Sequence, residues 1–264
     1  MADRITSREN PTIKYMIKLL SSAKARREEG RFVIEGARLC ADAAAGGCAV
    51  EALFYTEQAA EKYPDMLARI RACAPKETEL AGAAAAALGD TRTPQGVFCL
   101  CRILDKPSAS VKMNKYERLL LLEDIQDPSN LGAILRTAEA LGFPAVALSG
   151  GCCDVYSPKV LRGSMGAVFR LPCLTAEDLP GFIGALRADG FLTGAAVPAE
   201  DATPVTRITF PQKAAVAVGN EGNGLKPETI AACEQRITIP MRGRAESLNA
   251  AVAASILMWE MMRS

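Results

Sequence analysis

The stretch Ile239-Pro240-Met241-Arg242-Gly243-Arg244-Ala245-Glu246-Ser247-Leu248-Asn249 joins the last predicted strand of the chain to its last predicted helix. A β-type run, Arg236–Ile239, ends at Pro240, and a polar turn that contains Gly243 follows. Ser247 can cap the next helix, because its hydroxyl can accept a hydrogen bond from a backbone N–H group of the first turn. A junction of this kind offers free N–H groups and the positive end of a helix dipole to a ligand. Taken alone, the stretch is equally consistent with an ordinary helix that closes a domain.

The composition excludes several classes of chemistry. The chain of 264 residues has no histidine, which rules out Ser-His-Asp and Cys-His catalysis, histidine zinc sites and an imidazole base. Its nine cysteines include no Cys-x-x-Cys pair, so we expect reduced thiols and no metal. With 49% hydrophobic residues the chain can bury a core, and it contains no apolar run long enough to span a membrane. The N-terminus has no hydrophobic signal region, so we expect a cytoplasmic protein.

The second half of the chain alternates strand and helix. The run Ala214–Val218 is apolar at every position, which indicates a strand buried on both faces, as in a parallel sheet covered by helices. Ligands of such sheets bind beyond the carboxyl ends of the strands. Several polar loops of this half follow predicted strands, so we expect the functional site at that edge of the sheet. The predicted strands are Leu119–Leu122, Ala145–Leu148, Phe191–Ala195, Ala214–Val218 and Arg236–Ile239.

The first half predicts a smaller α/β domain of roughly 100 residues. Residues 1–30 are predicted to be helical, and strands are predicted at Arg31–Gly36, Val50–Tyr55 and Val97–Ile103. The basic residues of the first segment are open to two interpretations, a solvated helix face or a surface that contacts nucleic acid. Proline, serines and lysines between residues 105 and 115 indicate a linker. We therefore predict domains at 1–104 and 117–264, joined by a linker at 105–116.

Three polar motifs of the second half carry candidate chemistry. Asp127–Ala138 contains Asn130, which can cap a helix, and Arg136, which is either an ordinary surface cation or a phosphate contact. Gly219-Asn220-Glu221-Gly222-Asn223-Gly224 follows a buried strand and is either a flexible loop or a backbone-lined pocket faced by its glutamate. The glycine order in this loop is not that of a dinucleotide-binding loop. The third motif is the turn Ile239–Asn249.

In this order the three motifs resemble those of the SpoU, or TrmH-like, branch of the SPOUT RNA methyltransferases. Arg162–Ala167 also resembles that branch, and the resemblance covers residues 119–264 strongly. It extends more loosely to Arg31–Gly36 and Asp90–Gly96, which are similar to the small RNA-binding domain of the family. The resemblance implies an α/β fold, in which a SPOUT-type parallel sheet with a C-terminal trefoil knot follows a small L30e-like α/β RNA-binding domain. It also implies a homodimer.

For function, the resemblance implies transfer of a methyl group from S-adenosyl-L-methionine to a ribose 2′-hydroxyl of RNA, with 23S ribosomal RNA favoured over transfer RNA as the partner. Such a transfer needs in-line placement of donor and hydroxyl and a way to remove the hydroxyl proton, but neither metal nor histidine. A non-catalytic RNA-binding or ribosome-assembly protein is one alternative, and it predicts damage to Arg136 or the glycine loop, which the sequence lacks. An enzyme that acts on a small molecule is the other, and it leaves the basic N-terminal segment unexplained.

Motif by motif, the resemblance assigns roles to individual residues. The predicted catalytic residues are Arg136, Asn130 and Glu221, the predicted cofactor-binding residues are Gly219, Ile239, Met241, Ser247, Leu248 and Asn249, and the predicted RNA-binding residues are Arg26, Arg27, Arg31 and Gln95. The family is described with the arginine as the base, but a guanidinium does not readily give up its proton. We therefore expect Arg136 either to stabilise the developing alkoxide or to hold an RNA phosphate. Glu221 or a phosphate oxygen would then accept the proton.

Overall fold

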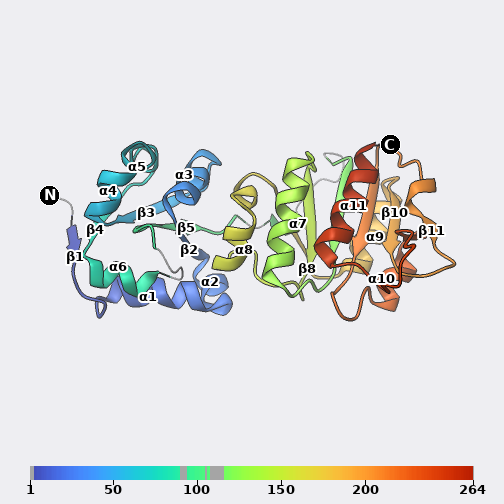
Figure 1. Cartoon of the computed structure of the whole chain (residues 1–264), viewed down its shortest axis with the longest axis horizontal. Coiled ribbons are helices and arrows are strands. Elements are labelled where there is room, and N and C mark those ends of the chain that lie inside the picture. Colours follow the sequence, from blue (N-terminus) through green and yellow to red (C-terminus); the bar gives the residue numbers. More distant parts are fainter. Residues whose placement is uncertain (1–2, 90–93, 105, 108–115, 264) are drawn as a thin grey trace. The chain divides into compact units, whose positions relative to one another are not determined.

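The computed structural model describes residues 3–89, 94–104, 106–107 and 116–263, and the chain divides into two compact units (Figure 1). The first unit comprises Met1–Leu104 together with Asp154–Phe169, and the second comprises Asp105–Cys153 and Arg170–Ser264. The predicted linker at 105–116 lies largely outside the described residues. Unlike the predicted domain 117–264, the second unit lacks the segment Asp154–Phe169, which packs with the first unit instead.

The first unit is built on a five-stranded sheet with the order β1-β4-β3-β5-β2. Strand β5 runs antiparallel to β2 and β3, and the remaining pairs are parallel. Helices α1 and α6 share an apolar cluster with one face of the sheet, while α3 contacts α5, β2 and β5. The strands are β1 (Asp3–Ile5), β2 (Arg31–Glu35), β3 (Val50–Tyr55), β4 (Glu77–Leu80) and β5 (Val97–Arg102), and the helices are α1 (Pro11–Ser21), α2 (Ala23–Glu29), α3 (Ala37–Ala45), α4 (Glu57–Lys62), α5 (Pro64–Arg71), α6 (Gly82–Leu88) and α8 (Pro158–Gly163).

The prediction that residues 1–30 are helical was wrong at the start of the segment, and Ser22 divides the rest into α1 and α2. Asp3–Ile5 is an edge strand that pairs in parallel with Glu77–Leu80, a strand that the sequence had not indicated. The helix α1 begins only at Pro11, because Asn10 caps it by accepting a hydrogen bond of 2.8 Å from the backbone N–H of Thr12. A proline in the first turn and an amide cap before it are the usual start of a helix.

The segment Asp154–Phe169 is held in the first unit by aromatic and ionic contacts. The ring of Tyr156 lies 4.5 Å from that of Phe32 on β2, measured between ring centroids. The hydroxyl of Tyr156 also accepts a hydrogen bond of 2.9 Å from the backbone N–H of Leu104. Asp154 forms an ion pair of 2.5 Å with Arg26 on α2, and the side chains are 12% and 4% exposed respectively. The chain therefore leaves the second unit after β8 and returns to it before β9, and the excursion includes the helix α8.

The second unit confirms the predicted parallel α/β fold. Its sheet has eight strands in the order β11-β13-β10-β12-β7-β8-β9-β6, and every pair in it is parallel. The central strands are apolar except for Arg118 at the start of β7 and Ser149 at the end of β8, because both faces of the sheet are covered. The strands are β6 (Lys106–Pro107), β7 (Arg118–Leu122), β8 (Ala145–Ser149), β9 (Cys173–Ala176), β10 (Leu192–Ala196), β11 (Thr203–Pro204), β12 (Ala214–Val218) and β13 (Gln235–Thr238).

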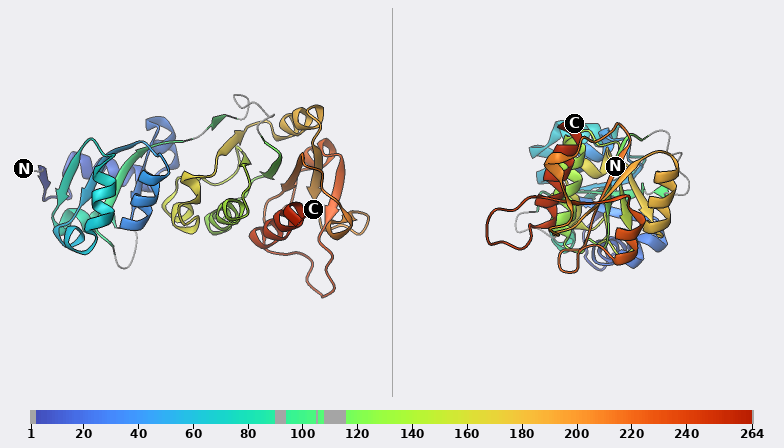
Figure 2. Two further views of the ribbon diagram at one scale, coloured as in Figure 1. Left: turned by 90° about the horizontal axis from the view of Figure 1, so that it is seen from above. Right: turned by 90° about the vertical axis from the view of Figure 1, so that its right-hand side faces the viewer.

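Two pairs of helices cover this sheet. Helices α7 (Pro128–Ala140) and α11 (Ala250–Arg263) pack against each other, and α11 also contacts β7 and β12. Helices α9 (Leu179–Ala188) and α10 (Pro227–Ala232) pack together and share a core cluster with the strands. Figures 1 and 2 show α7 and α11 side by side on one side of the sheet and α9 on the other. Within the described part of the chain, no helix is both long and apolar enough to cross a bilayer.

Candidate functional site

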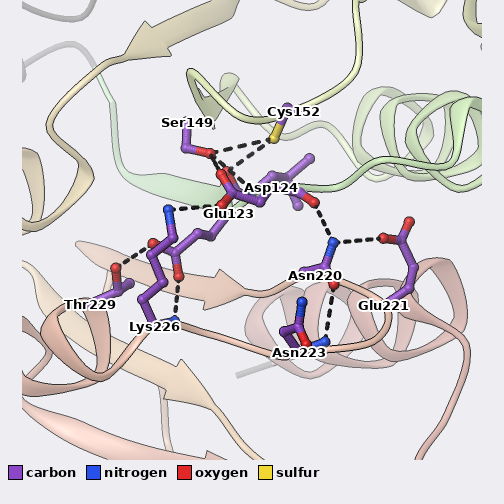
Figure 3. Close-up of polar contacts among 10 residues, drawn as sticks. Glu123, Asp124, Ser149, Cys152, Asn220, Glu221, Asn223, Lys226 and Thr229 are labelled. Atoms are coloured by element: carbon purple, nitrogen blue, oxygen red, sulfur yellow. Dashed lines mark hydrogen bonds and ion pairs between the residues drawn. The ribbon is translucent and has the colours of Figure 1, made fainter.

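The loop after β12 is a tight, internally bonded turn. The backbone groups of Asn220 and Gly224 exchange two hydrogen bonds of 3.0 Å, and the Asn220 side-chain oxygen accepts from the N–H groups of Gly222 and Asn223 at 2.9 and 3.0 Å. The side-chain amide of Asn220 donates to the carbonyl of Asp124 at 2.8 Å (Figure 3). Asn220 therefore shapes the loop and attaches it to the end of β7.

Gly219 allows this turn to close. A β-carbon at that position would lie 2.2 Å from the carbonyl carbon of Gly224 and 2.3 Å from the backbone nitrogen of Leu225. These atoms belong to the backbone and cannot rotate away, so every larger residue would push the two ends of the loop apart. The close approach, rather than an unusual backbone angle, requires glycine here.

A pocket of about 490 Å³ lies at the carboxyl ends of β10, β12 and β13. Its volume is within the usual range for a small-molecule site. Its wall includes the glycine loop, the residues after β10, the chain after β13 and the first turns of α11. Of the predicted cofactor-binding residues, the pocket is lined by Gly219, Ile239, Met241, Ser247 and Leu248. Asn249 is not among the lining residues, although Leu248 and Ala250 on either side of it are, and its side chain bonds to α7 instead.

Asn249 joins the three sequence motifs. Its side-chain amide donates a hydrogen bond of 2.8 Å to the side-chain oxygen of Asn130, and the amide of Asn130 donates one of 3.0 Å to the carboxylate of Glu221. Asn130 is only 7% exposed, whereas Glu221 and Asn249 are exposed, so the buried amide of Asn130 is the central member of this series. The sequence predicted that these motifs share one edge of the sheet, and the hydrogen bonds link one residue of each.

Both predicted helix caps were wrong by a few residues. Asn249, not Ser247, caps α11, because its side-chain oxygen accepts from the N–H groups of Ala251 and Val252 at 2.9 and 3.3 Å. Asp127, not Asn130, caps α7 by accepting from Ser129 at 2.7 Å. Each helix begins at a position that leaves an asparagine side chain close to the pocket. Asn130 lies inside the first turn of α7, where its amide is available to the other two motifs.

The carboxylate of Glu221 is saturated with donors. It accepts from the backbone N–H groups of Gln126 and Asp127 at 3.2 and 3.1 Å, in addition to the amide of Asn130. Burial raises the pKa of Glu221, but the hydrogen bonds from Asn130 and the backbone outweigh it, and the net pKa is lowered from its ordinary value. The group is therefore ionised at neutral pH and joins the glycine loop to the start of α7. A carboxylate with a lowered pKa is a weak proton acceptor.

Arg136 stands apart from this network. Its side chain is exposed on α7, and within the described residues it forms neither a hydrogen bond nor an ion pair. Six residues of helix separate it from Asn130, a rise of about 9 Å along the axis. Its neighbour Thr137 is 3.4 Å from Ser255 of α11, measured between the hydroxyl oxygens. The structure therefore unites Asn130 and Glu221 but leaves the third predicted catalytic residue free at the surface.

A second polar cluster, which the sequence had not singled out, lies next to the loop (Figure 3). Asp124 adopts a left-handed backbone conformation, with φ of 53°, and its carboxylate is 2.8 Å from the Lys226 ammonium and 2.7 Å from the Ser149 hydroxyl. Hydrogen bonding to Lys226 and Ser149 lowers the pKa of Asp124. The buried carboxylate of Glu123 accepts from the N–H of Lys226 at 2.7 Å and from the Thr229 hydroxyl at 2.5 Å. The sequence feature that could have identified this cluster is the pair of adjacent acidic residues, Glu123 and Asp124, directly after an apolar strand.

The predicted RNA-binding residues differ in their accessibility. Arg26 is 4% exposed, because its guanidinium is paired with Asp154 and donates to the carbonyl of Leu19 inside the first unit. This burial contradicts a surface role for Arg26. Arg31 is ion-paired with Glu51 at 2.6 Å. The helical periodicity of a basic segment does not distinguish a buried arginine from an exposed one when its partner lies far away in the sequence.

The other two predicted RNA-binding residues are exposed. Arg27 projects from α2, and within the described residues its side chain has no polar partner. Gln95 lies before β5, and its side-chain oxygen accepts a hydrogen bond of 2.8 Å from the N–H of Ala37. This bond caps α3, whose N-cap Gly36 has no side chain of its own to do so. Gln95 therefore has a structural role, which leaves its amide N–H groups as donors.

The fold and the pocket define a class of protein, a parallel α/β domain with a small-ligand pocket beside a glycine loop at the strand carboxyl ends. In the described part of the chain, no group of three or more acidic or cysteine side chains gathers to hold a metal ion. Residues 117–259 match the SpoU rRNA Methylase family and residues 10–99 match the MRM3-like substrate binding domain. The chain belongs to the SpoU rRNA methylase family, as its sequence motifs predicted.

Relatives over the full length of the chain agree with this assignment. The chain is 31% identical to the 23S rRNA (guanosine(2553)-2'-O)-methyltransferase RlmP of Bacillus subtilis, with 98% of each protein covered. It is similar to the AdoMet-bound rRNA methyltransferase structure from Sinorhizobium meliloti, with 28% identity, a TM-score of 0.87 and coverage of 99% of this chain and 98% of that one. The SpoU methyltransferase AviRb from Streptomyces viridochromogenes, also in complex with AdoMet, has a TM-score of 0.82 at 27% identity, over 97% of this chain and 98% of that one.

Proposed function

We propose that this protein transfers a methyl group from S-adenosyl-L-methionine to a ribose 2′-hydroxyl of 23S ribosomal RNA. The observation that carries the proposal is the hydrogen-bonded series Asn249–Asn130–Glu221 beside the pocket bounded by Gly219. It joins all three family motifs next to a cavity of suitable size. The substrate is inferred from the family and from the relative in Bacillus subtilis, which is named as a 23S rRNA 2′-O-methyltransferase. Because relatives are also named tRNA/rRNA methyltransferases, transfer RNA is the second candidate.

The pocket residues fit the proposed cofactor. When bound, S-adenosyl-L-methionine supplies an electrophilic methyl group on a sulfonium. The close approach of backbone around Gly219 leaves a surface of peptide groups, which can hydrogen-bond to the polar ends of such a molecule. Ile239, Met241 and Leu248 add apolar lining, and Ser247 adds a hydroxyl. We assign binding to these residues and to Gly219, and a positioning role to Asn249.

We assign the catalytic roles according to which side chains already have hydrogen-bond partners. Glu221 is ionised and receives hydrogen bonds from three donors of the α7 start, so we assign it the role of holding the site together and not that of proton acceptor. Asn130 positions both neighbouring motifs. Arg136 has a free, permanently charged guanidinium, which suits it to an RNA phosphate or to the developing alkoxide. A phosphate oxygen or solvent then receives the hydroxyl proton.

A homodimer would bring the free arginine to a second copy of the site. The helix α11 exposes large apolar side chains at Val252, Trp259 and Met262, which are 48%, 57% and 39% accessible. These positions are seven and ten residues apart, so they lie on one face of the helix. The same helix packs on α7, which carries Arg136. We propose that this face joins two copies, as the family resemblance implied, and that Arg136 acts near the dimer interface.

The first unit is proposed to bind the RNA. Its family match is a substrate-binding domain, and Arg27 offers an exposed cation for phosphate contacts. Arg31 can contribute only while remaining paired with Glu51. The cytoplasmic location predicted from the sequence is retained here as part of the proposal. The C-terminal trefoil knot and the L30e-like character of the first unit remain predictions of the family resemblance, and the linker at 105–116 remains a prediction from the composition of that segment.

The decisive experiment follows transfer of a labelled methyl group to 23S RNA transcribed without modifications, with transfer RNA transcripts in parallel. We expect Arg136→Ala to lower the rate about 100-fold or more, because removing one electrostatic donor from a reacting site has that effect. Calorimetry should find S-adenosyl-L-methionine binding unchanged in this variant. Arg207→Ala removes an exposed positive charge elsewhere in the second unit and serves as the control. Full activity of Arg136→Ala would refute its assignment, and no transfer to either RNA by the unaltered protein would refute the function.

A further inference from the structure

A second cavity, of about 360 Å³, lies in the first unit, and the reaction described above does not use it. It is separate from the pocket beside Gly219 and has no lining residue in common with it. Its lining includes Gly36, Arg38, Asp42, Gln95, Arg162 and Met165. These residues come from the start of α3, from the segment before β5 and from the excursion that contains α8.

The first two walls are fixed by local geometry. Arg38 and Asp42 are four residues apart on α3, so their side chains emerge from the same face of the helix. Gly36 precedes the helix with φ of 110°, a conformation that favours glycine, and it approaches the side chain of Gln95. The bond from the Ala37 N–H to Gln95 holds these two walls together at 2.8 Å. Within the described residues, the side chains of Arg38 and Asp42 have no polar partner of their own.

The third wall carries a strained residue. Met165 has φ of 51°, one of two non-glycine residues with a positive φ in the described part of the chain, and its side chain is 48% exposed. The left-handed region is unfavourable for an L-residue with a side chain of this size. Backbone strain at an exposed apolar residue beside a cavity is typical of a functional position. Arg162 lines the same side, at the end of α8.

The charges of the side chains that line the cavity indicate which class of ligand it can bind. The carboxylates of Asp42 and Glu35 beside Arg38 and Arg162 make the cavity unsuitable for a bare phosphate, which acidic groups repel. The same charges make it unsuitable for an apolar ligand. A nucleobase fits both properties, because its edge carries donors and acceptors while its flat face packs on guanidinium planes and apolar groups. Met165 supplies a flexible, polarizable apolar surface of this kind.

We infer that this cavity binds one unstacked base of the RNA substrate, with Arg38 and Asp42 reading the base edge and Met165 covering its face. The inference rests on the proposed function, because it presumes that the first unit binds RNA. Phosphate contacts elsewhere on the unit would provide affinity, and the cavity would provide base preference. The excursion Asp154–Phe169 then has a role of its own: it carries one wall of the base site on a segment whose ends continue into the catalytic sheet.

The test uses synthetic ribose decamers without bases, except for a single A, C, G or U at the fifth position. A fully abasic decamer measures the phosphate contribution, since all five strands carry the same charge. We expect at least one base to strengthen binding to the full-length protein about tenfold over the abasic strand, the lower part of the range for a bidentate base contact. In Arg38→Ala and Met165→Gly this gain should fall to about twofold or less. Met165→Gly suits the left-handed backbone, so it removes the side chain without endangering the fold.

Arg69→Ala is the matched control, because Arg69 is an exposed arginine on α5 of the same unit and does not line the cavity. We expect it to weaken all five strands equally and to preserve the gain from the single base. Equal binding of all five strands by the unaltered protein, or an unchanged gain in both cavity variants, would overturn the inference. Methyl transfer to 23S RNA by the unaltered protein is measured in parallel. If transfer occurs while the base gain is absent, the base site fails and the proposed function stands; if transfer is absent, the function itself fails.

Discussion

Replacing Gly219 with alanine perturbs the pocket that we propose for the cofactor, and it does so through backbone contacts alone. The added β-carbon would lie 2.2 to 2.4 Å from three backbone atoms of Gly224 and Leu225, more than 1 Å inside an ordinary contact. The loop can relieve this overlap only by opening, which separates Asn220 from Gly224 and breaks the two hydrogen bonds of 3.0 Å between them. At roughly 0.5 to 1.5 kcal/mol for each bond, the ordered loop loses about 1 to 3 kcal/mol.

That loss should appear in the affinity for S-adenosyl-L-methionine, because the opened loop must close again before the pocket forms. An energy of about 1 to 3 kcal/mol corresponds to a rise in Kd of about 5- to 150-fold. Titration calorimetry measures the Kd, and circular dichroism checks that the sheet remains folded. Gly222→Ala is the matched control in the same loop, since its β-carbon would lie 3.6 Å from the nearest atom, the Asn220 side-chain oxygen. The reasoning is refuted if Gly219→Ala binds the cofactor within about twofold of the unaltered protein.

Three further predictions address charge, burial and assembly. Because the pKa of Glu221 is lowered in the folded protein, its carboxylate stabilises the fold above the unfolded pKa of about 4.3, and this stabilisation is lost as the pH falls through the folded pKa. The melting temperature between about pH 3 and 6 should therefore depend less on pH in Glu221→Gln than in the unaltered protein. An equal dependence of melting temperature on pH in the two proteins would contradict this. Arg26→Ala should lower the free energy of unfolding by about 3 to 5 kcal/mol in denaturant titrations, because it leaves Asp154 buried without its partner, whereas Arg27→Ala should change it by less than about 0.5 kcal/mol. Trp259→Lys should shift the mass measured by light scattering from dimer towards monomer; an unchanged mass would argue against the α11 face as the interface.

How far the sequence predicts this fold depends on whether an element is determined locally. The runs Val50–Tyr55, apolar except for Glu51, and Ala214–Val218 are strands with the predicted bounds, because a short run of this kind is sufficient to identify them. The pair Asp3–Ile5 and Glu77–Leu80 is different. Each strand is short and partly polar, and it exists because the other lies beside it. No window of sequence around either one contains that information.

In the functional site, too, the sequence predicts what is determined locally and fails where contacts between distant segments decide. Polar loops after buried strands predicted correctly that Asn130, Glu221 and the turn before α11 would gather at one edge of the sheet. Which atom bonds to which was not predictable, because the choice depends on where each helix begins in three dimensions. Ser247 and Asn249 are both good caps by residue type. Only the position of α11 relative to α7 selects Asn249, which then both caps its own helix and bonds to Asn130.

The excursion that contains α8 illustrates a further limit. Its residues lie between two strands of the catalytic sheet, so the simplest interpretation of the sequence assigns them to the second domain. The structure attaches them to the first unit because Asp154 pairs with Arg26 and Tyr156 packs on Phe32. Both partners lie more than a hundred residues earlier in the sequence. Contacts over such separations leave no periodic signal. The same lack of signal made Arg26 appear to be one more surface cation.

The hydrogen-bonded series Asn249–Asn130–Glu221 keeps the site ordered although Arg136, which we propose as part of that site, has no polar partner within the described residues. Asn130 and Asn249 are amides, which do not titrate, and Glu221 has its pKa lowered by the donors around it. Their geometry therefore does not change near neutral pH, and these side chains have little remaining capacity to accept a proton. Arg136 has no such partner within the described residues. We propose that Arg136, outside this network, can adjust to a phosphate or alkoxide without the loss of an existing hydrogen bond, while Asn249, Asn130 and Glu221 keep the site ordered.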